Sequence, residues 1–270
     1  MAVAEIHLRE GGALQKMVSV SVIIPEGKPG PFPVYYLLHG LYDDHTAWLR
    51  RTSIDRYAEK LPIIVVMPNG DRSWYTDAAL MPDWKFETFI SRDLVSFVDR
   101  TFHTIPERRG RAIGGLSMGG YGAMKLALKH PDIYCAVVSH SGALNLIRNP
   151  NPRPDRPTLP TLPIIFGNTP VGGPDDLFSI AETADKSTLP AIQMDCGVDD
   201  FLIEHNRAFH ALLDKLDIPH EYTEHPGDHS WEYWDTHVQD ALLWVASEMG
   251  VGAAPTVRPD VPATPRRTEA

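Results

Sequence analysis

The sequence is 270 residues long, which suits one large α/β domain better than two ordinary domains. Hydrophobic residues make up 43% of it and charged residues 22%, so it holds enough apolar material for one sizeable core and is not disordered as a whole. Its net charge is −10, which argues against a nucleic acid or an anionic membrane as the main partner, because phosphate groups select basic surfaces.

The sequence also bears on location and redox environment. No stretch approaches the roughly 18 consecutive apolar residues of a membrane helix, and the first residues lack the basic and apolar segments of a signal peptide, so we expect a cytoplasmic protein. The two cysteines, Cys135 and Cys196, are too few for a disulfide framework and lack metal-type spacing. Because both lie in apolar runs, we expect two buried free thiols.

Strand-like and helical patterns alternate along the chain. Strand-like apolar runs occur at 18–25, 33–39, 63–67, 111–116, 134–140 and 191–196, with a weaker one at 220–224. Helical spacing of apolar residues occurs at 86–98, 121–129, 201–216 and 231–249. Such alternation predicts an α/β fold, in which helices cover both faces of a mostly parallel central sheet.

Two segments depart from this pattern. Residues 149–163 contain six prolines, which disfavour both helix and central strand, so this stretch is either a surface loop or a cap over a pocket. Residues 250–270 have few large apolar groups and are expected to be a disordered or surface-bound tail. We therefore expect one domain over residues 1–249, followed by a Pro-rich tail at 250–270.

The strongest local pattern is G-x-S-x-G at residues 115–119, which follows a predicted strand and opens a predicted helix. This context is typical of a nucleophile elbow, a turn so tight that its serine is strained and the residues two before and two after it must lack side chains. Ser117 would lie at a helix N-terminus, which favours a developing negative charge. The alternative is a glycine-rich packing turn; a phosphate loop is disfavoured because no G-K-[ST] follows.

A serine hydroxyl needs a base near neutral pH. In enzymes with this motif the order along the chain is nucleophile, acid, histidine, so the base is expected late among the twelve histidines. His229 lies in a glycine-containing loop before the last predicted helix and is the preferred base, with His225 in reserve. His205 and His210 fall on an amphipathic helix and are expected to be surface or packing groups.

The acid must hold the imidazole in one tautomer and should follow a strand between Ser117 and His229. Residues 194–202 contain three aspartates and fit this requirement. Asp195 still belongs to the predicted strand, whereas Asp199 and Asp200 occupy the loop. Spacing alone does not separate those two.

The remaining requirement is an oxyanion hole. The apolar run at 35–38 ends in His39 and Gly40, and Gly40 lets the backbone turn so that the N–H of Leu41 can face a substrate carbonyl. The N–H of Met118, next to the serine, is the expected second donor. His39 is then a structural hydrogen-bonding residue rather than a base.

Taken together, these motifs resemble those of the esterase D-like α/β-hydrolases, most closely the tributyrin-esterase branch. Relatives include S-formylglutathione hydrolases, feruloyl and acetyl-xylan esterases, and mycolyltransferases. The resemblance covers roughly residues 5 to 248. It is carried by Leu-Leu-His-Gly at 37–40, Met-Pro-Asn-Gly at 67–70, Ser-Trp-Tyr-Thr-Asp at 73–77, and the motifs at 115–122, 195–202 and 227–231.

The resemblance implies more than the spacing does. The Gly-x-x-Asp-Phe-Leu pattern points to Asp200 as the acid, and the family implies a cofactor-free hydrolase of short acyl esters, with homo-oligomers common among relatives. Formylglutathione-cleaving members usually carry histidines on either side of the elbow. This chain has Leu116 and Tyr121 there, which disfavours that activity.

The sequence therefore predicts a serine carboxylesterase. His229 would take the Ser117 proton, an acyl-serine would form and water would release it, with activity falling at acid pH as His229 protonates. The main alternative is a feruloyl or acetyl-carbohydrate esterase, followed by acyl transfer and by a non-catalytic binding protein. The lack of an export signal favours small, diffusible esters over polymers.

Aromatic residues near the motifs are candidate walls of an acyl or alcohol pocket, with core packing as the alternative for each. With Gly40, the candidates are Trp48, Trp74, Tyr75 and Trp231. No metal is expected, because His225 and His229 have no further ligand cluster beside them.

Overall fold

The computed structural model describes residues 1–252 apart from 11, 154, 156 and 169. The predicted tail therefore lies outside the described residues from position 253 onward. In the described part of the chain no helix is both long and apolar enough to cross a membrane.

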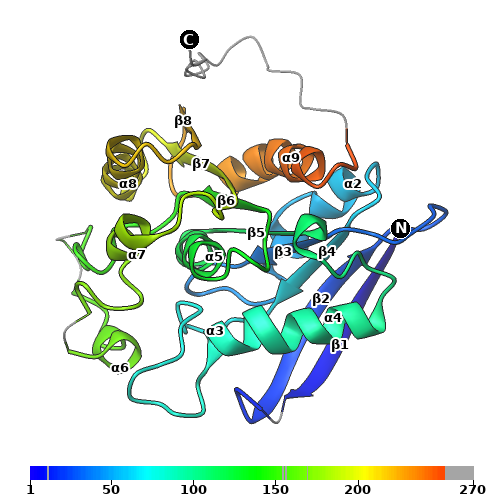
Figure 1. Ribbon diagram of the computed structural model, residues 1–270, viewed down its shortest axis with the longest axis horizontal. Coiled ribbons are helices and arrows are strands. Elements are labelled where there is room, and N and C mark those ends of the chain that lie inside the picture. Colours follow the sequence, from blue (N-terminus) through cyan, green and yellow to red (C-terminus); the bar gives the residue numbers. More distant parts are fainter. Residues whose placement is uncertain (11, 154, 156, 169, 253–270) are drawn as a thin grey trace.

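The described residues form an eight-stranded sheet in the order β1-β2-β4-β3-β5-β6-β7-β8 (Figure 1). β1 pairs antiparallel with β2, and β2 with β4, whereas each neighbouring pair from β4 to β8 is parallel. This confirms the predicted mostly parallel sheet. The strands are β1 (Ala2–Glu10), β2 (Lys16–Ile24), β3 (Val34–Leu38), β4 (Ile64–Pro68), β5 (Arg111–Leu116), β6 (Ala136–His140), β7 (Ala191–Gly197) and β8 (Glu221–His225).

Helices cover both faces of the sheet, as predicted. The helices are α1 (Ala47–Arg51), α2 (Ile54–Ala58), α3 (Phe86–Thr88), α4 (Val95–Thr101), α5 (Met118–Lys129), α6 (Leu162–Phe166), α7 (Leu177–Thr183), α8 (Ile203–Lys215) and α9 (Trp231–Glu248). A π-helical turn, η1 (Phe89–Leu94), joins α3 to α4, and a 3₁₀ turn, η2 (Arg108–Gly110), precedes β5.

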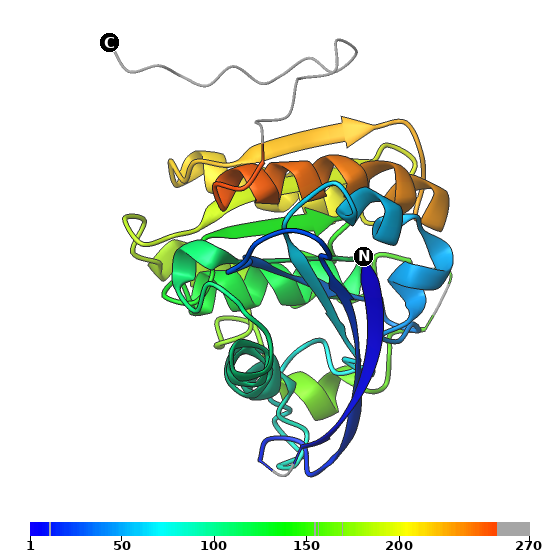
Figure 2. The same ribbon diagram turned by 90° about the vertical axis from the view of Figure 1, so that its right-hand side faces the viewer.

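Each face of the sheet has its own hydrophobic core. One strand contributes side chains to both cores, because successive side chains along it point to opposite faces. In β3, Tyr36 and Leu38 join the core beneath α4 and α5, while Tyr35 and Leu37 join the core beneath α2 and α9. Figures 1 and 2 show α2 and α9 on one side of the sheet and α4 and α5 on the other. A strand buried on both faces must be apolar throughout, which is why these strands appear as continuous apolar runs.

The structure adds elements that the sequence patterns did not reveal. β1 was not predicted, because it forms the edge of the sheet and exposed and half-buried residues alternate along it. The prediction that prolines exclude helix from 149–163 is wrong at the end of that segment, because Pro163 lies in the first turn of α6, where no backbone donor is needed. Cys196 is a buried free thiol as expected, whereas Cys135 is only half-buried.

Candidate active site

Ser117 occupies the turn between β5 and α5, with φ +54° and ψ −113°. Its backbone N–H donates to the carbonyl of His140, 2.9 Å away, and its own carbonyl accepts from Tyr121 and Ala143. These bonds, to β6, to α5 and to the loop after β6, hold a conformation that a serine rarely adopts. The strained elbow predicted from the sequence is present.

The glycines around Ser117 are required by close backbone contacts. A Cβ at Gly115 would lie 2.7 Å from the backbone of Gly119, and a Cβ at Gly119 would lie 2.5 Å from the carbonyl oxygen of Leu38. No larger residue fits either position without moving the backbone. This confirms the steric reason for the two glycines of G-x-S-x-G.

His229 faces Ser117 from the loop between β8 and α9. Its Nε2 lies 3.0 Å from Ser117 Oγ, and its Nδ1 lies 2.8 Å from Asp200 Oδ2. A carboxylate can only accept, so Nδ1 carries the ring proton and Nε2 is left to accept from the serine hydroxyl. This is the tautomer that a general base needs.

Asp200 comes from the loop after β7, and its side chain is fully buried, whereas that of His229 is 17% exposed. Its second oxygen accepts from the backbone N–H of Leu202 at 2.7 Å. The geometry thus separates the aspartates that spacing left open: Asp200 bonds to His229, while Asp199 is exposed. The reserve base, His225, instead stacks on His237 with ring centroids 4.1 Å apart.

The predicted oxyanion loop lies beside the serine. A Cβ at Gly40 would be 3.9 Å from Ser117 Cβ. His39 is buried; its Nδ1 donates to the Gly40 carbonyl at 2.7 Å, and its Nε2 accepts from the N–H of Gly70 at 2.8 Å. Burial also lowers the pKa of His39, so a neutral ring fixes this loop, as expected of a structural residue.

The two amides expected to hold an oxyanion are those of Leu41 and Met118. Within the described part of the chain neither donates to a backbone or side-chain acceptor outside the regular helices and strands. Leu41 directly follows Gly40, and Met118 is the first residue of α5. Both N–H groups are therefore available to a ligand at the serine.

The aromatic pocket candidates are largely buried, which corrects part of the prediction. Trp48 and Tyr75 are 1% and 0% exposed. Trp48 donates from Nε1 to the carbonyl of Leu38, and Tyr75 donates from its hydroxyl to the carbonyl of His39. These two side chains support the oxyanion loop from inside the core and have no surface to offer a substrate.

The other two tryptophans also pack mainly against protein. Trp74 is 4% exposed and packs edge-on against Tyr121, with Phe166 of α6 nearby. Trp231 is half-buried and packs edge-on against Trp48 and Trp234. Trp231 is thus the one of the four aromatic candidates that keeps more than a trace of exposed surface.

Sequence reasoning missed the ring that flanks the histidine. Phe201 directly follows Asp200, is 38% exposed, and its ring centroid lies 4.4 Å from that of His229. The guanidinium of Arg153 lies over the Phe201 ring at 5.4 Å. Since Arg153 belongs to the Pro-rich segment, that segment borders the site, which favours the cap over a remote surface loop.

A second histidine–aspartate pair was also missed. His140 Nδ1 lies 2.6 Å from Asp195 Oδ2, and the hydroxyl of Tyr233 donates to Asp195 Oδ1 at 2.9 Å. All three side chains are buried. Burial by itself raises the pKa of Asp195, but His140 and Tyr233 outweigh it and hold that pKa below its usual value. Because His140, the last residue of β6, lies opposite Asp195 of β7, the register of these two parallel strands was the signal that would have paired them.

Comparison with known proteins identifies the family of the chain. The model of the Esterase family, described as "Putative esterase", matches residues 11–245. Over 265 residues the chain is 28% identical to an acetyl esterase of Caldicellulosiruptor saccharolyticus, covering 91% of this chain and 98% of that protein.

Two solved structures are similar over nearly their whole length. The fluorophosphonate-binding serine hydrolase FphF of Staphylococcus aureus is 27% identical, with a TM-score of 0.81 over 90% of this chain and 98% of that one. A ferulic acid esterase is 28% identical, with a TM-score of 0.78 over 92% and 98%.

The fold and these comparisons define an α/β-hydrolase. The chain belongs to the Esterase family, and it is a serine esterase, an enzyme that hydrolyses carboxylic esters. The family resemblance drawn from the motifs is thereby confirmed.

Proposed function

We propose that this esterase hydrolyses short-chain acyl esters through an acyl-serine on Ser117, with His229 as general base and Asp200 as the acid that orients it. The single observation that carries the proposal is the continuous chain of hydrogen bonds from Ser117 Oγ through His229 to Asp200. Residues 1–249 form the catalytic domain in this proposal.

The proposed cycle has two matching halves. His229 Nε2 takes the Ser117 proton as Oγ attacks the ester carbonyl carbon, and the N–H groups of Leu41 and Met118 stabilise the resulting oxyanion. The C–O bond then breaks, His229 gives its proton to the departing alcohol, and the acyl group stays on Ser117. Water attacks the acyl-serine with the same proton transfers and releases the acid.

Two observations support a small acyl group. The similar acetyl esterase is covered almost completely by the match, so the likeness extends over the whole catalytic domain. In addition, Trp48 and Tyr75, which bond to the backbone of the oxyanion loop, are packed into the core and leave no free apolar surface there for a long chain.

Hydrolysis of p-nitrophenyl esters with two to twelve carbons tests this proposal. We expect the highest kcat/KM at two to four carbons, and a loss of about 10⁶-fold in kcat for Ser117→Ala. Circular dichroism of Ser117→Ala controls for folding. A folded wild type that is inactive on every chain length, or a Ser117→Ala variant that retains activity, would overturn the proposal.

A feruloyl esterase is the second candidate, favoured by the exposed ring of Phe201 beside His229 and by the similar ferulic acid esterase. An aromatic surface at the mouth of the site can stack on a phenolic acyl group. The ratio of kcat/KM for methyl ferulate and p-nitrophenyl butyrate separates the two candidates. If the ferulate ester is preferred and Phe201→Ala removes that preference, the second candidate replaces the first.

A further inference from the structure

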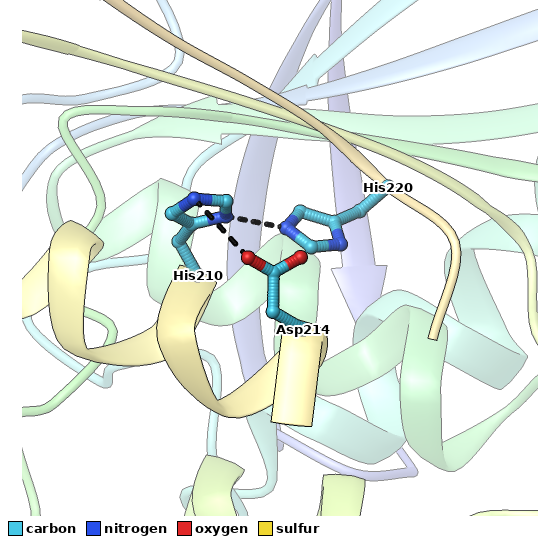
Figure 3. Close-up of side chains that lie close together, drawn as sticks. All are labelled: His210, Asp214 and His220. Carbon is cyan, nitrogen blue, oxygen red and sulfur yellow. Dashed lines mark hydrogen bonds and ion pairs between the residues drawn. The ribbon is translucent and has the colours of Figure 1, made fainter. Parts of the chain in front are cut away.

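Three side chains with metal-binding atoms gather at the end of β8 that is remote from the active site (Figure 3). His210 and Asp214 lie one turn apart on α8, and His220 directly precedes β8. One ligand atom from each lies within 4.8 Å of the others, and no other such group of three occurs in the described part of the chain. His229 follows the far end of this five-residue strand, about 15 Å away by strand geometry.

His220 is held in a tautomer that can bind a metal ion through Nε2. Its Nδ1 lies 2.9 Å from the carbonyl oxygen of Ile218, and because a carbonyl can only accept, this nitrogen carries the proton. The lone pair of the neutral ring is therefore on Nε2, which points toward His210. A backbone carbonyl that fixes the far nitrogen in this way is the usual partner of a metal-bound histidine.

His210 completes a pair of facing nitrogens. Its Nδ1 lies 2.7 Å from His220 Nε2, so a proton on His210 occupies the space between the two rings. The other His210 nitrogen, Nε2, lies 3.6 Å from Asp214 Oδ2. The His210 ring packs against Tyr222 with centroids 4.7 Å apart, which limits its movement.

We propose that His210, Asp214 and His220 form a binding site for a divalent transition-metal ion such as Zn²⁺. The ion replaces the proton between the two imidazoles, and that proton moves to His210 Nε2. Two imidazoles and one carboxylate suit Zn²⁺, Co²⁺, Ni²⁺ or Cu²⁺, whereas Mg²⁺ and Ca²⁺ prefer sets of oxygen ligands. Three protein ligands leave a fourth position for water.

The required rearrangement is small. Bonds of about 2.0–2.1 Å in tetrahedral geometry place two ligand nitrogens about 3.3 Å apart, so the facing nitrogens must separate slightly from their present 2.7 Å. Asp214 is 66% exposed at its side chain and is free to turn toward the ion. Figure 3 shows its carboxylate already directed toward the two rings.

Metal binding would tie the last turns of α8 to the start of the edge strand β8. Because an ion that binds only the folded chain stabilises it, we expect the unfolding temperature to rise by about 5 °C at a free-metal concentration 100-fold above Kd. This inference does not depend on the proposed function, since its ligands lie outside the triad.

Isothermal titration of the untagged, full-length chain with Zn²⁺, together with the visible spectrum of the Co²⁺ complex, tests the site. We expect one ion per chain with a four-coordinate Co²⁺ spectrum, and affinity at least about tenfold lower in His220→Ala and in Asp214→Asn. Asp214→Asn changes an exposed side chain and controls for loss of folding in the histidine variant. His7→Ala and His229→Ala, on other surfaces, should bind as the wild type does.

The proposal fails if the wild type binds Zn²⁺ with a Kd above about 1 mM. It also fails if His220→Ala and Asp214→Asn keep wild-type affinity. If His229→Ala alone abolishes binding, the ion occupies the triad and the site proposed here is wrong.

Discussion

Two histidine–aspartate pairs lie at the carboxyl ends of the parallel strands, and they differ in what each histidine faces. His229 is bonded to Asp200 and presents its Nε2 to Ser117 at the surface of the site. His140 is bonded to Asp195, but its Nε2 is buried and meets no hydrogen-bond partner in the described part of the chain. The same two residue types thus meet in two environments, only one of which offers a nitrogen to a reactant.

This difference shows that a bonded pair is not by itself a catalytic site. The outer pair joins two loops that follow β7 and β8, where a substrate can reach it. The inner pair joins the last residue of β6 to a residue within β7, and the His140 carbonyl holds the backbone N–H of Ser117. We infer that the outer pair performs the proton transfer and the inner pair positions the elbow.

The largest expected effect is that of removing the outer imidazole. His229→Ala should lower kcat by about 10⁶-fold, because it removes the imidazole that faces Ser117 Oγ and that we propose as the proton acceptor. Its effect on the unfolding temperature should be smaller than that of breaking the inner pair, since the His229 side chain is 17% exposed whereas both partners of the inner pair are buried. Steady-state kinetics with p-nitrophenyl acetate and a thermal melt of the same preparation check both statements.

The acid of the outer pair should matter less than its base. Asp200→Asn keeps the shape but puts an amide where the carboxylate accepts from His229, so the imidazole loses its fixed tautomer, and kcat should fall by about 10⁴-fold. Asp199→Asn, one residue earlier and exposed, is the matched control and should leave kcat unchanged. Equal losses in the two variants would contradict the assignment of Asp200.

Crowding the oxyanion loop should lower kcat less than replacing the acid does. In Gly40→Ala the new methyl group would lie 2.7 Å from Leu116 Cδ1 and 2.9 Å from Asp43 Oδ2, so the ends of these two side chains must shift, and Leu116 directly precedes Ser117. A shift of about 1 Å in a catalytic group lowers the rate by about 10²-fold. We expect a loss of up to about 10²-fold in kcat, with KM nearly unchanged. A variant with wild-type kcat would contradict this prediction and show that the two side chains give way without moving a catalytic group.

The inner pair should show the reverse balance of effects. Asp195→Asn leaves His140 and Tyr233 with a poorer acceptor and should destabilise the fold by about 3 kcal/mol, as expected when a buried pair is broken. Its kcat should fall by less than that of Asp200→Asn, since Asp195 contacts no reacting atom and acts on Ser117 only through His140. Urea unfolding and steady-state kinetics on one preparation measure the two effects. A loss of kcat as large as that of Asp200→Asn would contradict the different roles assigned to the two pairs.

The pH dependence of stability sharpens the same comparison. The folded-state pKa of Asp195 lies below its ordinary value, so its stabilising contribution is complete above about pH 4 and is lost as the pH falls through that lower pKa. The difference in unfolding free energy between wild type and Asp195→Asn should be constant from about pH 8 to about pH 5 and shrink below about pH 4. A difference that grows toward acid pH would contradict the lowered pKa.

The sequence revealed the parts of the molecule that depend on local chemistry. Ser117 follows from a turn that demands two glycines, and the parallel strands follow from runs that must be apolar on both faces. Spacing limited the candidates for the acid to Asp199 and Asp200. Only the conformation of the loop distinguishes these two, because it buries Asp200 against His229 and leaves Asp199 exposed.

What the sequence did not reveal depends on contacts between distant segments. His140 meets Asp195 only because β6 and β7 pair in one register. Arg153 contacts Phe201 only because the folded chain brings this part of the Pro-rich segment beside the loop after β7. Aromatic residues near the motifs were candidates for the pocket wall. The side chains of Trp48 and Tyr75 instead donate hydrogen bonds to backbone carbonyls inside the core.

Labelling with an alkyl fluorophosphonate, followed by mass spectrometry of the intact chain and its peptides, tests the central claim most directly. The account predicts one adduct per chain, located on Ser117, formed rapidly by the wild type and by Asp195→Asn but far more slowly by His229→Ala. An adduct on any other serine, or a folded wild type that is not labelled, would contradict the claim that Ser117 is the nucleophile activated by His229.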